Sequence, residues 1–272
     1  MPEDLTIAVI RGLDWVSLRP YAVSLARTGS PCTKLVLLED TSEEARKHLL
    51  DLGFTLVDRA PTPKEFGVWE YGVHRFPPAI EYLRQNEGRF RYVLWTDIRD
   101  VVFQSDPFLW FEKNLAPNKI VVAGLGHAIK DCPYNDPWVR ACSPAEHGAV
   151  RQKEAVACGT FGGTADAMLK LLQAIYGGCK AANQAWATDQ GMLNVLVRRP
   201  EYGARITGTD ELLSAQWWPA RNDDPIIYPW YFRPVFDKTD GLVKGPGGIP
   251  YSIVHLYDRD AAWISIMREK YK

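Results

Sequence analysis

The first sixty residues alternate between short apolar runs and segments with helical spacing, and this order limits the fold more than any other feature. Short apolar runs predict strands at Leu5–Ile10, Lys34–Leu38 and Thr55–Val57. Apolar residues every three or four positions predict a helix at Trp15–Arg27, and an acidic first turn with a glycine after the end predicts another at Ser42–Leu52. A strand–helix–strand–helix–strand order predicts an α/β fold with a mostly parallel central sheet flanked by helices.

The rest of the chain is less regular, and it has no internal repeat or clear linker, so one domain over residues 1–272 is expected. The apolar pattern predicts further strands at Tyr92–Trp95, Ile120–Gly124, Ala157–Gly163 (ending in a turn) and Ser252–Leu256, and helices at Pro77–Gln85, Asp166–Tyr176, Thr188–Val197 and Ala261–Lys270. Residues 126–150, rich in Pro, Gly, Asn and Asp, predict a long loop, and residues 217–250 predict an irregular aromatic segment.

Composition excludes several classes of protein. Hydrophobic residues make up 46% of the chain, enough for a full core, and the net charge of −1 gives no general attraction to nucleic acid. The five cysteines are an odd number without a CxxC pair, which favours reduced thiols in a reducing compartment. No signal peptide or membrane-spanning run is visible. We expect a cytoplasmic protein without a transmembrane segment, and peripheral membrane association remains open.

The segment RYVLWTDIRDVVFQSDPF carries the strongest functional signal. An apolar strand ends at Asp97 and Asp100, and ligands of open α/β sheets bind just outside the carboxyl ends of strands. Two carboxylates there suit a hard divalent cation, and such a cation often accompanies phosphate. The alternative is a capping aspartate and a solvated ion pair with Arg99.

Three further motifs follow in the chain. CGTFGGT (158–164) has three glycines in five residues, which allow backbone to approach a ligand closely or form a tight turn. In TDQGMLN, Asp189 and Gln190 either open a helix or contact a polar substrate at a cleft. In VHLYDR, His255 is structural unless its strand end meets Asp97 and Asp100, in which case an imidazole and two carboxylates would suit Mn²⁺. No P-loop, GxGxxG or GxSxG motif is present.

Together and in this order, these motifs resemble those of the GT-A glycosyltransferases, nucleotide-sugar-dependent enzymes with a single Rossmann-like domain. The segment VLWTDIRDVVF resembles their DxD metal motif, CGTFGGT their acceptor-side turn, TDQGMLN the DQDxLN segment of family 8 and related transferases, and VHLYDR their late histidine segment. The resemblance covers about residues 5–260. It implies a nucleotide-binding half at about residues 1–106 and an acceptor-side half at about residues 107–272.

The resemblance implies a metal-dependent transfer of a sugar from a UDP- or GDP-type donor to a glycan or other hydroxyl acceptor, as in polysaccharide biosynthesis. Mn²⁺ or Mg²⁺ would be held by Asp100 and His255 with Asp97, although the Asp-x-x-Asp spacing departs from Asp-x-Asp and Asp97 could instead contact the ribose. Asp189 and Gln190 would act near the reacting sugar, with a slight preference for a retaining mechanism.

The remaining implied contacts are with substrate. Expected nucleotide or substrate residues are Arg11, Arg75, Asp97, Gly162, Gly163, Trp217 and Trp218, with Trp230 as a further part of an aromatic acceptor platform. A sugar nucleotidyltransferase is the main alternative, but Leu5–Arg19 lacks the Gly-rich basic signature of that class. A non-catalytic carbohydrate-binding protein is the other alternative, although such modules are mostly all-β.

Overall fold

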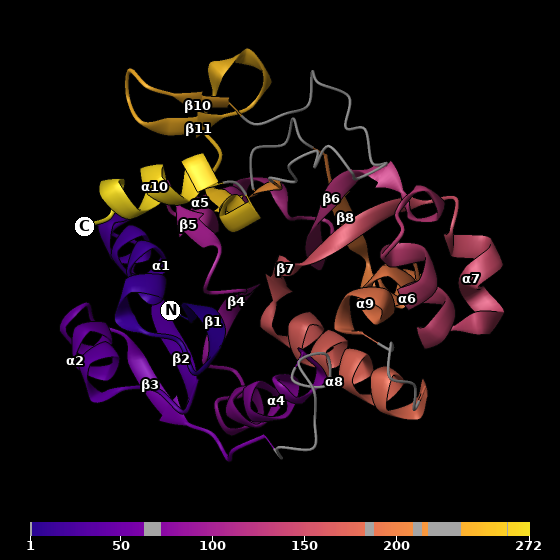
Figure 1. The fold of residues 1–272 in the computed structure, drawn as a ribbon. Helices are drawn as coiled ribbons and strands as arrows, with labels where there is room; N and C mark the ends of the chain where they lie inside the picture. The colour runs from indigo at the N-terminus through magenta and orange to yellow at the C-terminus, as the bar shows by residue number, and fades with distance from the viewer. Residues whose placement is uncertain (1, 63–71, 183–187, 209–213, 217–234, 260) are drawn as a thin grey trace.

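A seven-stranded sheet forms the centre of the protein (Figure 1). The computed structural model describes residues 2–62, 72–182, 188–208, 214–216, 235–259 and 261–272. In spatial order the strands are β3 (Thr55–Asp58), β2 (Thr33–Glu39), β1 (Glu3–Arg11), β4 (Phe90–Thr96), β7 (Glu154–Thr164), β6 (Ile120–Ala128) and β8 (Ala204–Thr207). Within this sheet β7 alone runs antiparallel to its neighbours, so the predicted mostly parallel sheet is confirmed.

Helices cover both faces of the sheet because successive strand residues point to opposite sides. In β1, Ile7 packs into one core and Ala8 into the other. The first face is covered by α4 (Phe76–Gln85), α8 (Ala165–Ala182) and α9 (Asp189–Leu196), and the second by α1 (Trp15–Arg27), α2 (Glu43–Asp51) and α5 (Pro107–Asn114). Each fully buried large apolar side chain contributes about 1.5–3 kcal/mol. The predicted flanking helices are thus confirmed.

A small second sheet brings the end of the chain back to the central one. Its strands are β5 (Val101–Phe103), β12 (Ile253–His255) and β9 (Ser214–Gln216), with β12 in the middle. The register pairs His255 with Val101, directly after Asp100. Helix α10 (Ala261–Lys270) packs Trp263 and Met267 against this sheet. A separate hairpin is formed by β10 (Val235–Asp237) and β11 (Leu242–Lys244), and short 3₁₀ turns are η2 (Pro200–Tyr202), η4 (Pro246–Gly248) and η5 (Tyr257–Arg259).

The predicted loop at residues 126–150 is wrong. This stretch contains η1 (Ile129–Asp131), α6 (Asn135–Cys142) and α7 (Pro144–Val150). Pro137 and Pro144 sit in the first turns of the two α-helices, where a missing backbone N–H is tolerated, and Pro133 precedes α6, so none of them breaks a helix. A satellite core that contains Val139 and Val150 holds both helices against the sheet.

The predicted turn at the end of CGTFGGT is also wrong. Residues 154–164 form the continuous strand β7, paired with β4 and β6 on either side. At Gly162 a Cβ would lie 2.7 Å from Phe111, and at Gly163 one would lie 2.1 Å from the carbonyl oxygen of Lys119. These glycines allow neighbouring residues to pack closely against the strand. The glycine-rich sequence therefore indicates close packing inside the sheet rather than a turn. None of the described helices is both long and apolar enough to cross a bilayer.

Candidate active site

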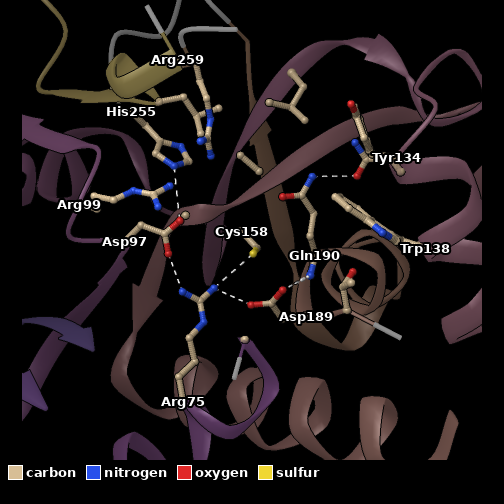
Figure 2. Close-up of a pocket in the computed structure, with 17 residues that line it drawn as sticks. Arg75, Asp97, Arg99, Tyr134, Trp138, Cys158, Asp189, Gln190, His255 and Arg259 are labelled. Atoms are coloured by element: carbon tan, nitrogen blue, oxygen red, sulfur yellow. Dashed lines mark hydrogen bonds and ion pairs between the residues drawn. The ribbon is translucent and has the colours of Figure 1, made fainter. Parts of the chain in front are cut away.

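A cavity of about 470 Å³ opens beside the carboxyl end of β4 (Figure 2). Its lining comes from the residues before α4, the segment after β4, β6, the start of α6, the middle of β7, the start of α9, and the end of β12 with the segment after it. The lining residues that carry chemistry are Arg75, Asp97, Arg99, Tyr134, Asn135, Trp138, Cys158, Gly159, Asp189, Gln190, His255 and Arg259. The fold thus brings the separated sequence motifs to one place.

Asp97, Asp100 and His255 form a compact group of possible metal ligands. His255 Nε2 lies 3.6 Å from Asp97 Oδ2 and 3.8 Å from Asp100 Oδ1, and one ligand atom from each of the three lies within 4.8 Å of the others. The pairing of β12 with β5 causes this proximity, because it sets His255 beside the residue that follows Asp100. Two carboxylates and an imidazole suit Mn²⁺, so the donor set fits the expected ion.

Gly159 provides the space that this group needs. A Cβ at residue 159 would lie 2.2 Å from His255 Nε2 and 2.6 Å from Asp97 Oδ2. The carbonyl oxygen of Gly159 also accepts a 2.7 Å hydrogen bond from the backbone N–H of Asp97. Gly159 therefore both fixes the position of Asp97 and leaves open the space in front of the imidazole.

The two carboxylates differ in their electrostatic surroundings. Burial acts to raise the pKa of Asp97, but the positive charge of Arg75 and a hydrogen bond with His255 outweigh it and hold that pKa below its usual value. For Asp100, burial is the main influence and raises the pKa to about 6, although His255 acts against it. A bound cation would offset the unfavourable burial of the Asp100 charge.

Arg75 joins the metal group to the start of α9, as Figure 2 shows. Its guanidinium donates to Asp97 Oδ1 at 2.5 Å and to Asp189 Oδ2 at 2.5 Å. A third donor contact reaches Cys158 Sγ at 3.5 Å. Burial acts to lower the pKa of Arg75, but the two carboxylates raise it well above its usual value. Burial also raises the pKa of the Cys158 thiol, so this cysteine is unsuited to act as a nucleophile.

The first turn of α9 presents Asp189 and Gln190 to the cavity. The Thr188 hydroxyl caps this helix by accepting from the N–H of Gly191 at 3.0 Å. Asp189 Oδ1 accepts from the N–H of Gln190 at 2.8 Å. The Gln190 amide donates to Asn135 Oδ1 at 2.9 Å, which ties α9 to α6. The helix-start interpretation of this motif is therefore confirmed, and both residues also line the cavity, while their contact with a polar substrate stays a prediction.

Two arginines beside the metal group add positive charge to the cavity. Arg99 Nε lies 3.0 Å from Asp258 Oδ2, and Arg259 Nη2 lies 3.8 Å from Asp100 Oδ2. About half of the Arg99 side chain and 42% of the Arg259 side chain are exposed. Both groups can reach an anionic ligand next to a cation at Asp97 and Asp100.

The structure separates several expected substrate residues from this cavity. Gly162 and Gly163 lie inside β7, among packed residues, and do not line this cavity, although contact with substrate was expected of them. Arg11 lies at the end of β1, with Nε 3.4 Å from Glu39 Oε1, and is also outside the lining. Trp217, Trp218 and Trp230 lie outside the described residues.

Other residues of the cavity are absent from the sequence-based site. Gly159 is the first glycine of CGTFGGT. The motif was therefore correctly placed at the site, but the glycine that lines the cavity is Gly159 and not Gly162 or Gly163. Arg259 is the last residue of VHLYDR, four positions after His255. Tyr134 and Trp138 were assigned to a loop, although their spacing of four is that of neighbours on one helix face.

The comparisons with known proteins support the fold. No protein-family model matches the sequence, and no curated protein matches it. The galactosyltransferase LgtC in complex with donor and acceptor sugar analogues is 14% identical and has a TM-score of 0.57, with 99% of this chain and 96% of that chain covered. An active-site mutant of LgtC, in which glutamate replaces a glutamine, gives the same identity and TM-score over 98% and 94%. Core-mannan synthase A from Aspergillus fumigatus in a Mn/GDP form is 12% identical, with 76% and 73% covered and a TM-score of 0.49. The chain has the GT-A fold, as the sequence motifs predicted.

Proposed function

We propose that this chain is a metal-dependent glycosyltransferase that moves a sugar from a nucleoside-diphosphate donor to a carbohydrate or other hydroxyl acceptor. One observation carries the proposal: Asp97 and His255 line the same cavity as the Arg75–Asp189 pair, at the carboxyl end of a strand in a GT-A fold, and the buried Asp100 completes their ligand group. The LgtC structures share this fold, and one of them binds donor and acceptor sugar analogues, which supports sugar transfer.

The residues divide into a group for the leaving nucleotide and a group for the sugar. Asp97, Asp100 and His255 would hold Mn²⁺ or Mg²⁺, which would neutralise the charge of the leaving nucleoside diphosphate. Arg99 and Arg259 line the cavity next to this group and would bind the diphosphate oxygens. Arg75 lies between Asp97 and Asp189, and the sugar of the donor would bind on the side of Asp189 and Gln190.

The surroundings of Asp189 support a retaining mechanism. Arg75 occupies one carboxylate oxygen and the N–H of Gln190 occupies the other. These two partners restrict the directions from which an acceptor hydroxyl could approach the carboxylate, whereas an inverting enzyme requires a base that is open to that hydroxyl. Asp189 is instead placed to orient the donor sugar and to stabilise positive charge that develops at its anomeric carbon.

A thermal-shift panel tests the proposal. UDP, GDP, ADP and CDP are each added with Mn²⁺ or with EDTA, because a ligand that binds the native state raises the melting temperature by mass action. We expect one nucleotide to raise the melting temperature in the presence of Mn²⁺ and not in EDTA. Asp100→Ala should abolish this increase. Glu112→Ala, a surface carboxylate beside Arg91, is the matched control that should keep it. No increase with any nucleotide would contradict the proposal.

A further inference from the structure

A second cavity of about 620 Å³ adjoins the first. Its lining comes from α6 and the residues on either side of it: Pro133, Tyr134, Pro137, Trp138, Arg140, Ala141 and Pro144. Tyr134 and Trp138 line both cavities. The two rings therefore form a shared wall, and a ligand in the second cavity would lie against the same side chains as a ligand in the first.

The chemistry of this wall suits a flat face with C–H groups. The rings of Tyr134 and Trp138 lie with centroids 5.8 Å apart at an interplanar angle of 35°, and 43% of Tyr134 is exposed. Three prolines extend the apolar surface, and Arg140 supplies the charged group of the described lining. A pyranose ring matches this surface, because its C–H face stacks on aromatic rings while its hydroxyl groups bind polar neighbours.

Helix α6 is fixed relative to the residues of the first cavity. Asn135, which is 2% exposed, accepts from the Gln190 side chain at 2.9 Å and from the Asn194 side chain at 3.3 Å. At Gly191 a Cβ would lie 2.7 Å from the carbonyl oxygen of Trp138, so the two helices touch through their backbones. The aromatic pair therefore keeps a set distance from Asp189 and Gln190.

We propose that Tyr134 and Trp138 form the acceptor platform of this protein and bind the C–H face of a pyranose unit of a glycan acceptor. The inference rests on the proposed function and adds the acceptor class and its binding surface. A sugar stacked on this wall would extend a hydroxyl group into the first cavity, toward the donor sugar held near Asp189 and Gln190. This platform, at the start of α6, consists of other residues than Trp217, Trp218 and Trp230, which the sequence suggested for that role.

Saturation-transfer NMR with lactose, maltose and cellobiose tests the platform without knowledge of the donor. We expect at least one of these sugars to bind the wild-type protein, with saturation of the C–H protons of one ring face. Tyr134→Ala and Trp138→Ala should each weaken that binding at least fivefold. Tyr134→Phe keeps the ring and should bind like the wild type, and Leu109→Ala removes an exposed apolar residue of α5 as a control.

The nucleotide assay separates failure of the platform from failure of the proposed function. Tyr134→Ala changes an exposed side chain, so it should fold and melt cooperatively like the wild-type protein, and the control Leu109→Ala should keep the Mn²⁺-dependent nucleotide shift. Sugar binding that is unchanged in both alanine variants would overturn the platform, and so would the absence of binding by all three sugars. A missing nucleotide shift in the wild-type protein would instead overturn the proposed function.

Discussion

The guanidinium of Arg75 lies 2.5 Å from a carboxylate oxygen of Asp189, although 114 residues separate the two in the chain. The same guanidinium binds Asp97, so one arginine connects the segment after β4 with the start of α9. The contact with Asp189 is largely shielded from solvent, since 13% of the Arg75 side chain and 11% of the Asp189 side chain are exposed, whereas 31% of the Asp97 side chain is exposed. The position of the proposed sugar-binding carboxylate relative to the metal group therefore depends on a single side chain.

Arg75→Met should destabilise the protein strongly. The substitution leaves the buried Asp189 and the partly buried Asp97 without their counter-charge, and removal of one partner from a buried ion pair costs about 3–5 kcal/mol. Urea denaturation measures the change in the free energy of unfolding. The matched control is Arg46→Met, which removes a surface pair with Asp58 and should cost about 1 kcal/mol or less. Equal losses in the two variants would show that Arg75 makes no special contribution.

Asp100→Asn should stabilise the metal-free protein at pH 7.5 while it abolishes Mn²⁺-dependent nucleotide binding. Burial raises the pKa of Asp100 from 3.8 to about 6, so the folded state binds this proton more tightly than the unfolded state. Ionisation of Asp100 therefore lowers the free energy of unfolding as the pH rises from about 4 to 6. Above pH 6 the full loss is present, and it amounts to up to about 3 kcal/mol. Melting temperatures in EDTA at pH 4.5 and 7.5 check the sign: the gain from Asp100→Asn should appear at pH 7.5 and shrink at pH 4.5.

Gly159→Ala should remove metal-dependent nucleotide binding without a change of charge. The new methyl group would fall 2.2 Å from His255 Nε2 and displace the imidazole from its place near Asp97. Thermal shift with the nucleotide and Mn²⁺ measures the effect. Gly177→Ala is the control, because no atom lies within 4 Å of its added Cβ, and it should keep the shift. A normal Mn²⁺-dependent shift in Gly159→Ala would argue against a role for this histidine at the metal.

Gly191→Ala should destabilise the protein even though alanine favours helices. Its Cβ would meet backbone atoms of Trp138 at 2.7 and 2.8 Å and Cys142 Sγ at 2.9 Å, which forces α6 away from α9. Overpacking of this kind costs about 1–3 kcal/mol, whereas Gly177→Ala in α8 should stabilise by about 1 kcal/mol. Urea denaturation of both variants distinguishes the two effects. A gain in stability in Gly191→Ala would contradict the close helix contact.

Two helices show which parts of the fold local sequence patterns can predict. The helix Trp15–Arg27 agrees with its prediction at both ends, because its apolar spacing and its flanking residues are local signals. The helix Ala261–Lys270 agrees in the same way. Residues 126–150 were mispredicted because their prolines and glycines suggested a loop, while the contacts that hold α6 and α7 come from β6, β7 and α9. Such contacts leave no trace in the local pattern.

The candidate site was predictable in its motifs but not in its geometry. Asp97, Asp100 and His255 were grouped from the sequence, and the structure brings them together. The Arg75 contacts with Asp97 and Asp189 could not be read from the sequence, because nothing local indicates which distant carboxylates an arginine meets. The role of Gly159 could not be predicted for a different reason. The three glycines of CGTFGGT look alike in the sequence, and only tertiary contacts distinguish the glycine at the metal group from the two inside the sheet.

The pairing of β12 with β5 has a consequence for the newly made protein. His255 lies more than 150 residues after Asp97 and Asp100 in the chain, and β12, the central strand of this small sheet, brings it back to them. During translation, the strands β1 to β4 and their helices can assemble well before residue 255 has been synthesised. A nascent chain at that stage carries both aspartates without the imidazole, so the complete ligand group arises only after residue 255 has been synthesised and has left the ribosome.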